Sequence, residues 1–150
     1  MGTLSQSLFG QKVYIDVNVF IYLLEGVEPW ASSVQKMLMG MEAGNWQAVT
    51  SELSLAESLV KPFQLDREDL AQLYKEALSP RDHFSLAPVD SATLISAARL
   101  RALHGFKLPD AIHAATALTQ GCTAFLTNDA GFRRTPGIQC VLLPDWIDKK

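Results

Sequence analysis

The segment KVYID, residues 12–16, is a short apolar run that ends in an acid, and it indicates a buried strand. Four more runs of strand length follow: QAVT at 47–50, FSLAPV at 84–89, AFLT at 124–127 and IQCVLL at 138–143. Longer segments with helix-like spacing separate these runs, and this alternation is typical of a parallel sheet covered on both faces. We therefore predict an α/β fold, a three-layer α/β/α sandwich around a central, mainly parallel sheet.

Helices are predicted in the intervals between these strands. Behind Pro29 and before Gly44, apolar residues recur at helical spacing: Trp30, Val34, Met37, Leu38 and Met41. Further helices are predicted at 54–61, 66–78, 90–104 and 109–121. The last of these is apolar almost all round, so we expect it to be deeply packed.

Length and composition indicate one globular unit. The chain has 150 residues, 48% of them hydrophobic and 19% charged, which suits a single core. We predict a flexible N-terminus over residues 1–11 and a single domain over 12–150. Two cysteines fit buried thiols in a reducing compartment, and no apolar stretch approaches the ~20 residues of a membrane span, so we expect a cytoplasmic protein. The net charge of -3 argues against a protein that coats nucleic acid with positive charge, but does not exclude an enzyme acting on it.

Four carboxylates follow strands or begin helices in this prediction: Asp16, Glu57, Asp110 and Asp129. Such positions line the crevice beyond the carboxyl ends of a parallel sheet, so the four acids are expected to face one site. Each acid alone is also explained as a helix cap, and SLAE at 54–57 matches a capping box. Two carboxylates about 5 Å apart repel by roughly 3 kcal/mol, so a cluster of four requires a cation.

The donor types narrow the identity of that cation. Oxygen ligands without thiolate or imidazole suit Mg²⁺, with Mn²⁺ as a substitute, rather than zinc. The histidines show no zinc-binding spacing: His83 and His104 are predicted on the surface. His113 shares a helix face with Asp110, and is predicted to be a packed polar residue, with substrate contact as the alternative.

Four motifs resemble the PIN-domain nucleases, and within them the VapC-type toxins of toxin–antitoxin pairs. They are VYIDVNVFIYLL at 13–24, SELSLAE at 51–57, LPDAIHAATAL at 108–118 and FLTNDAGF at 125–132. The resemblance implies a PIN-like fold for the domain. It also implies that Asp16, Glu57, Asp110 and Asp129 bind metal and act in catalysis, with Asn18 and Thr127 as polar supports of the substrate-binding site.

The resemblance further implies an activity and partners. An RNA phosphodiester would be hydrolysed by water activated on Mg²⁺. Lys107, Arg133 and Arg134 are candidates for phosphate contacts, and ordinary solvated charges are the alternative. The implied partners are a cognate antitoxin, the RNA substrate and a second copy in a homodimer, without a membrane. Trp30 and Met41 are predicted to contact the antitoxin, whereas Val34 and Leu38 are assigned to the core.

Two alternatives keep acids at strand ends but change the function. A phosphoryl-transfer hydrolase of the haloacid-dehalogenase type would place a second acid at position 18, where this chain has Asn18. A non-catalytic PIN-fold binding scaffold would not require all four acids.

Overall fold

The computed structural model describes residues 3–146, and within them an α/β fold confirms the predicted class. The strands are β1 (Lys12–Ile15), β2 (Gln47–Ser51), β3 (Phe84–Ala87), β4 (Ala124–Thr127) and β5 (Gln139–Leu142). The helices are α1 (Leu4–Ser7), α2 (Val17–Leu24), α3 (Trp30–Glu42), α4 (Glu52–Gln64), α5 (Glu68–Ala77), α6 (Ser91–His104) and α7 (Leu108–Thr119), with short 3-10 turns η1 (Ala130–Arg134) and η2 (Leu143–Asp145).

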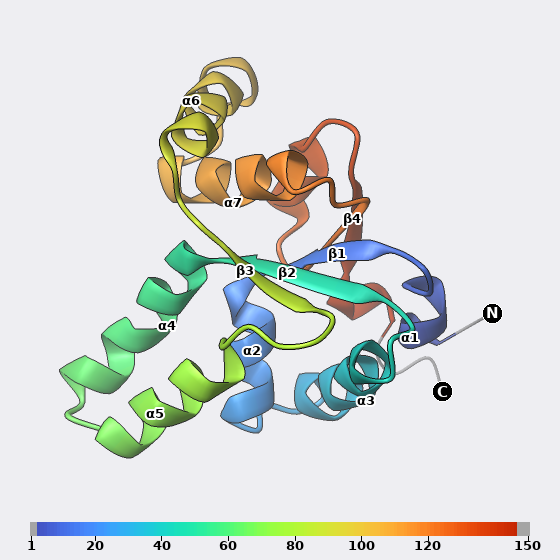
Figure 1. Ribbon diagram of the computed structural model, residues 1–150, viewed down its shortest axis with the longest axis vertical. Coiled ribbons are helices and arrows are strands. Elements are labelled where there is room, and N and C mark those ends of the chain that lie inside the picture. Colours follow the sequence, from blue (N-terminus) through green and yellow to red (C-terminus); the bar gives the residue numbers. More distant parts are fainter. Residues whose placement is uncertain (1–2, 147–150) are drawn as a thin grey trace.

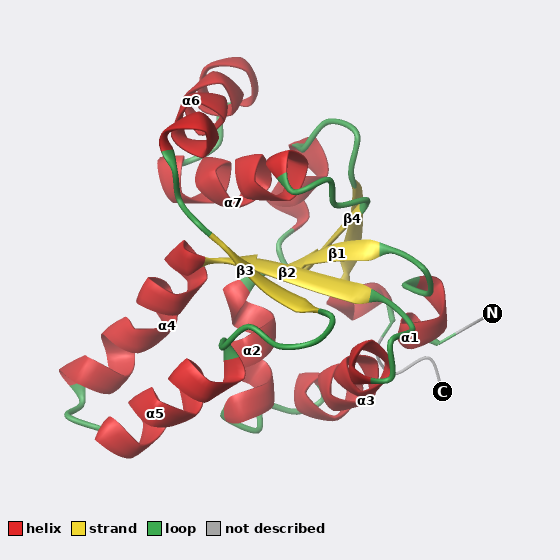
Figure 2. Cartoon of the chain, viewed as in Figure 1, coloured by secondary structure: helices red, strands yellow, loops and turns green. Residues whose placement is uncertain are grey.

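The strands of the described chain form one parallel sheet in the order β3-β2-β1-β4-β5 (Figure 2). The chain adds strands outward from β1 to β3, then returns to place β4 on the other side of β1. This reversal creates a switch point between β1 and β4, where ligands bind in many open α/β sheets. Asp16 follows β1 and Asp129 follows β4, so both lie at the switch point.

Side chains of β1 alternate between two cores, one on each face of the sheet. Val13 and Ile15 pack with residues of α2 and α3, whereas Tyr14 packs with residues of α6 and α7. Figure 1 shows α6 and α7 on one side of the sheet and α2 and α3 on the other. The buried apolar run at 12–16 therefore serves both cores, as expected for a central parallel strand.

The apolar stripe of α3 faces the core over most of its length. Val34 and Leu38 are buried, which confirms their assignment. Met41 is 0% exposed, so its prediction as an antitoxin contact was wrong. Trp30 is half-buried and stacks on Tyr22, with ring centroids 5.8 Å apart. Apolar periodicity predicts that one face of a helix is buried, but not which element covers it. In α3 this face packs in the core that contains Val13 and Ile15 of β1.

The N-terminal segment differs from the predicted flexible stretch at 1–11. Thr3 and Gln6 form a reciprocal capping box that begins α1. Leu4 and Leu8, four residues apart, are buried in the core that contains α3. Residues 1–2, like 147–150 at the end of the predicted domain, lie outside the described residues.

Within residues 3–146, no helix has both the length and the apolar content needed to cross a membrane. Cys122 is buried and Cys140 is half-buried, and both thiols are free. Burial raises the pKa of Cys122 to about 11, so this thiol stays protonated and unreactive at neutral pH.

Candidate active site

Asp16 is a buried acid at the carboxyl end of β1, with 6% of its surface exposed. It is the N-cap of α2, and its carboxylate accepts hydrogen bonds from the Thr127 hydroxyl at 2.6 Å and from the Asn18 amide at 3.4 Å. Burial raises the pKa of Asp16 and Glu57 adds to the rise, while Thr127, His113 and the Asn18 amide oppose it. Asp16 is thus a helix cap and a costly buried charge at once.

Thr127 connects two of the predicted acids. It ends β4 beside β1, is fully buried, and donates its hydroxyl proton to Oδ2 of Asp16. The hydroxyl oxygen of Thr127 also accepts the backbone N–H of Asp129 at 3.0 Å. Asp129 in turn caps η1, because its Oδ1 accepts the Gly131 N–H at 2.8 Å. Thr127 therefore acts as a support, and its hydroxyl is occupied by protein contacts.

Glu57 lies on α4, but the predicted capping box at 54–57 is wrong. The N-cap is Ser51, whose hydroxyl accepts the Leu53 N–H, so the helix begins at Glu52. Ser54 is instead buried and bonded to Thr50. The earlier start moves Glu57 into the second turn, where its side chain is 35% exposed and its Oε1 lies 2.7 Å from Nε2 of His113.

Asp110 lies in the first turn of α7, as predicted, one residue after Pro109. It is half-buried. Burial raises its pKa, the charges of Asp129 and Glu57 raise it further, and His113 and Lys107 lower it. The positive end of the helix favours an acid here, yet its carboxylate neighbours oppose its ionisation.

Glu57 and Asp129 act electrostatically on the two more buried acids. Glu57 raises the pKa of both Asp16 and Asp110, and Asp129 raises that of Asp110. Among the described residues, however, no three histidine, cysteine, aspartate or glutamate side chains converge closely enough to hold a metal ion. The oxygen-only donor chemistry fits Mg²⁺ or Mn²⁺, and ligation by three of these acids requires side-chain rotation from the arrangement described.

The predicted cations differ in how freely they can act. Lys107 is exposed and close enough to lower the pKa of Asp110. Arg133 is exposed and lies near Cys140: burial raises the pKa of that thiol, and the charge of Arg133 opposes the rise. The guanidinium of Arg134 is held by the backbone, because it donates hydrogen bonds to the carbonyls of Gly131 at 2.9 Å and His104 at 3.1 Å. Asn18 is exposed, and it is its backbone amide that contacts Asp16.

Two tyrosines at the site were not predicted from the sequence. Tyr14 is fully buried two residues before Asp16, and its hydroxyl lies 2.6 Å from Nδ1 of His113. Tyr22 of α2 accepts a hydrogen bond from the side chain of Asn128, the residue that directly precedes Asp129. A buried tyrosine in a strand needs a polar partner, and this requirement was the available signal for Tyr14.

His113 is confirmed as a packed polar residue, since it is buried and bonded on both ring nitrogens. His83 and His104 are exposed, as predicted.

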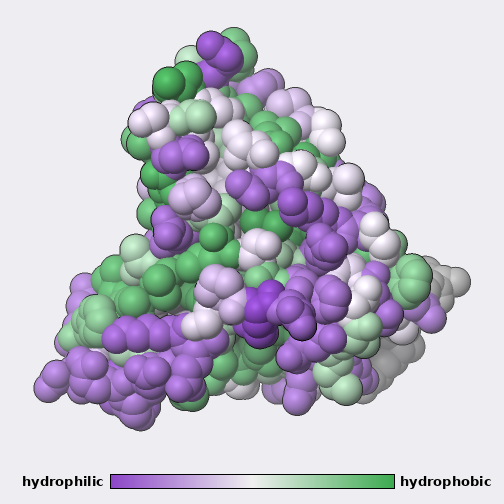
Figure 3. Space-filling model, viewed as in Figure 1, coloured by the Kyte–Doolittle hydropathy of each residue, from purple (hydrophilic) through white to green (hydrophobic). Residues whose placement is uncertain are grey.

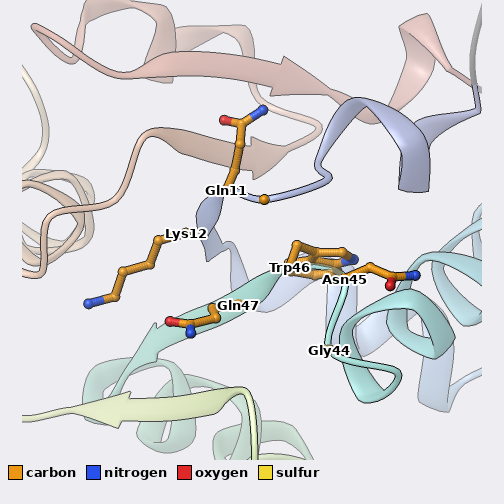
Figure 4. A pocket seen from close by; sticks show the side chains of 7 residues that line it. Gln11, Lys12, Gly44, Asn45, Trp46 and Gln47 are labelled. Atoms are coloured by element: carbon orange, nitrogen blue, oxygen red, sulfur yellow. The ribbon is translucent and has the colours of Figure 1, made fainter.

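A hollow of about 260 Å³ lies at the opposite end of the strands (Figure 4). It is lined by Gly10, Gln11, Lys12, Gly44, Asn45, Trp46 and Gln47, where β1 and β2 begin. None of these lining residues is an acid.

Comparison with known proteins decides the family. The sequence profile of the PIN domain matches residues 13–138, which contain all four acids. The chain belongs to the PIN domain family. The haloacid-dehalogenase alternative is not favoured by this match.

Solved structures of PIN-domain toxins share the fold. VapBC2 from Rickettsia felis, solved with promoter DNA, is 15% identical over 87% of this chain and 98% of that chain, with a TM-score of 0.67. A toxin–antitoxin complex from Klebsiella pneumoniae is 25% identical over 84% and 94%, with a TM-score of 0.62. Mycobacterium tuberculosis VapC20, described as a sarcin-ricin loop cleaving toxin, is 14% identical over 85% and 97%, with a TM-score of 0.67. No curated protein sequence matches the chain.

Proposed function

We propose that this PIN-domain protein is a metal-dependent endoribonuclease and the toxin of a toxin–antitoxin pair. The observation that carries the proposal is the effect of neighbouring carboxylates on the two more buried acids: Glu57 raises the pKa of Asp16 and Asp110, and Asp129 that of Asp110. A protein that keeps interacting carboxylates partly buried bears a cost, and a cation that binds between them offsets it.

The side chains of the site have separate tasks in this proposal. Asp16, Glu57, Asp110 and Asp129 would hold Mg²⁺ or Mn²⁺, and Thr127 keeps the Asp16 carboxylate in one orientation. The bound ion would activate water for attack on phosphorus and neutralise charge on the phosphate oxygens. Lys107, exposed beside Asp110, is the cation best placed to attract an RNA phosphate.

RNA as the substrate is supported by the likeness to VapC20, which is described as cleaving the sarcin-ricin loop. The toxin role is supported by the complex from Klebsiella pneumoniae, the most identical of the three structures compared here. A cytoplasmic location accords with a cellular RNA substrate.

An antitoxin contact is better placed on α4 than on the buried stripe of α3. Val60 is 53% exposed and Phe63 is similarly open, one and two turns beyond Glu57. Figure 3 shows hydrophobic surface gathered over α4. An antitoxin segment with apolar residues for this surface and a basic side chain for the acids would bind here and block the site.

A matched pair of substitutions tests this contact. Val60→Glu should weaken the copurified complex with the protein of the neighbouring reading frame by at least tenfold in Kd. Met39→Glu, at an exposed methionine of α3, should leave it unchanged.

Size measurement of the purified toxin tests the homodimer that the family resemblance implies.

Nuclease activity is tested with the purified chain, freed of any partner, on total RNA and defined oligonucleotides. Cleavage is expected with Mg²⁺ or Mn²⁺ and should stop with EDTA. Asp110→Asn should abolish it without unfolding, because the change removes a ligand charge while keeping the side chain's size. Asp90→Asn is the control, since the Asp90 carboxylate caps α6 by accepting the Thr93 N–H at 2.9 Å. Its charge is not among those that shift the pKa of Asp16 or Asp110.

Cleavage that survives EDTA would contradict the metal mechanism. A folded protein without cleavage under any of these conditions would favour the non-catalytic scaffold.

A further inference from the structure

Three side chains from separate elements form a continuous hydrogen-bond chain that ends at Glu57. The Tyr14 hydroxyl of β1 lies 2.6 Å from Nδ1 of His113 on α7. Nε2 of the same ring lies 2.7 Å from Oε1 of Glu57 on α4. Tyr14 and His113 are buried, and Glu57 is partly exposed. The chain thus runs from the core to the edge of the acid site.

The surroundings of Tyr14 set the direction of these hydrogen bonds. A tyrosine with its ordinary pKa of about 10 is protonated at neutral pH, so the buried phenol has a hydrogen to donate. The nearby Thr50 hydroxyl donates its own proton to the Ile15 carbonyl at 2.8 Å. The Tyr14 hydroxyl therefore donates to Nδ1 of His113. Because Nδ1 then accepts, the neutral ring carries its hydrogen on Nε2. That N–H then donates to the Glu57 carboxylate.

The contact fixes only one carboxylate oxygen of Glu57. Glu57 projects from the second turn of α4, and no other side-chain hydrogen bond to it is found in the described chain. A glutamate held at Oε1 alone keeps Oε2 for another partner, and the charge of Glu57 already acts on Asp16 and Asp110. Without the imidazole, the glutamate would sample several rotamers, and ordering it on metal binding would cost side-chain entropy.

We propose that Tyr14 and His113 are positioning residues that hold Glu57 in place for the acid site. The inference rests on the proposed metal-dependent function. Outer hydrogen bonds of this kind orient metal ligands in many proteins, and their loss typically weakens metal affinity by about 10–100-fold. His113 acts through Glu57 and needs no contact with the substrate.

The test measures Mn²⁺ binding by calorimetry, independently of cleavage. His113→Leu removes both hydrogen bonds and should weaken Mn²⁺ affinity by about 10–100-fold. His113→Gln places an amide donor near the position of Nε2, so affinity should stay within a few-fold of wild type. Tyr14→Phe keeps the ring that packs 4.8 Å from Phe125 and should cause a smaller loss than His113→Leu.

Two further measurements separate positioning from a general structural effect. In a Glu57→Gln background, His113→Leu should cause no further loss of Mn²⁺ affinity, because the group it positions has changed. The ¹⁵N NMR signals of His113 should show hydrogen on Nε2 in the wild type and a mixture of tautomers in Tyr14→Phe. Thr116→Val is the control, since Thr116 is buried on α7 but donates to the Ile112 carbonyl of its own helix.

The outcomes distinguish this inference from the function on which it rests. Wild-type protein that binds Mn²⁺ and cleaves RNA, together with unchanged affinity in His113→Leu, would overturn the positioning role alone. Wild-type protein that binds no Mn²⁺ would overturn both. If His113→Leu fails to fold, Tyr14→Phe and His113→Gln decide the matter, because Phe keeps the packed ring of Tyr14 and Gln keeps a buried polar group at position 113.

Discussion

The carboxyl ends of β1 and β4 carry interacting acids, one of them almost fully buried, whereas the amino ends of β1 and β2 border an open hollow lined by amides and Lys12. This hollow lies at the end of the strands without the four acids. At the other end, a threonine and a histidine hold the acids in position. The candidate site of this protein is therefore marked by carboxylates whose pKa values burial raises, and not by the presence of a hollow.

The largest expected difference between the two ends is in catalysis. Asp16→Asn should lower RNA cleavage on the order of 10³-fold, because it removes a ligand charge worth several kcal/mol of transition-state stabilisation. Lys12→Ala in the hollow should leave cleavage unchanged. Initial rates at saturating Mg²⁺ measure both, and equal losses in the two variants would break the comparison.

The second difference concerns metal binding and thermal stability. Mg²⁺ at about 100 times its Kd adds roughly 2.7 kcal/mol to the free energy of unfolding, which raises Tm by roughly 5–10 °C in a chain of this length. Asp129→Asn should reduce this rise, and Lys12→Ala should preserve it. Calorimetric scans with Mg²⁺ and with EDTA measure the two Tm values. If Tm does not change with Mg²⁺, four independent helix caps would explain the acids better.

A third, smaller difference is the pH dependence of stability in the metal-free protein. Burial raises the folded-state pKa of Asp16 above its usual value of 3.8, so the folded state holds its proton to higher pH than the unfolded state. Stability therefore falls as pH rises from the unfolded-state pKa through the folded-state pKa of Asp16, and the penalty is largest above both. Asp16→Asn removes the penalty, while its amide can still cap α2.

The expected result is a gain of a few degrees in Tm at pH 7 that fades as the pH is lowered toward 4. Melting curves in EDTA across this range measure the gain, with Asp90→Asn as the comparison variant. A gain of equal size at every pH would mean that the ionisation of Asp16 is not its source.

The smallest effect is expected in the hollow itself. Gln47 is exposed, so Gln47→Ala should change the free energy of unfolding by no more than about 0.5 kcal/mol and leave Mn²⁺ affinity unchanged. A loss of Mn²⁺ affinity in this variant would extend the functional surface to the amino ends of the strands.

The strands of this sheet were predictable because central parallel strands are compact apolar runs with clear borders. The run at 124–127 coincides with β4, and that at 12–16 extends one residue past β1, to Asp16. Asp110 and Asp129 were also placed correctly, since Pro109 and the end of β4 are local signals. Local sequence is sufficient where one short segment determines the conformation.

Errors arose where two local signals compete or where partners are distant. Ser51 and Ser54 are both suitable N-cap residues. Ser51 is the N-cap of α4, whereas the Ser54 hydroxyl forms a hydrogen bond with Thr50. Arg134 was predicted to contact phosphate, but its guanidinium donates a hydrogen bond to the carbonyl of His104, 30 residues earlier in the sequence. The pairing of Tyr14 with His113 spans 99 residues, so no local pattern reveals it.

The bond between Asp16 and Thr127 spans 111 residues, and this separation has a consequence for synthesis on the ribosome. A growing chain cannot complete the site until β4 has been translated and has inserted beside β1. At about 5–20 residues per second, that delay lasts from several seconds to almost half a minute. Each new molecule therefore spends most of its synthesis without the Thr127 support of Asp16, and the order of the strands itself postpones assembly of the site.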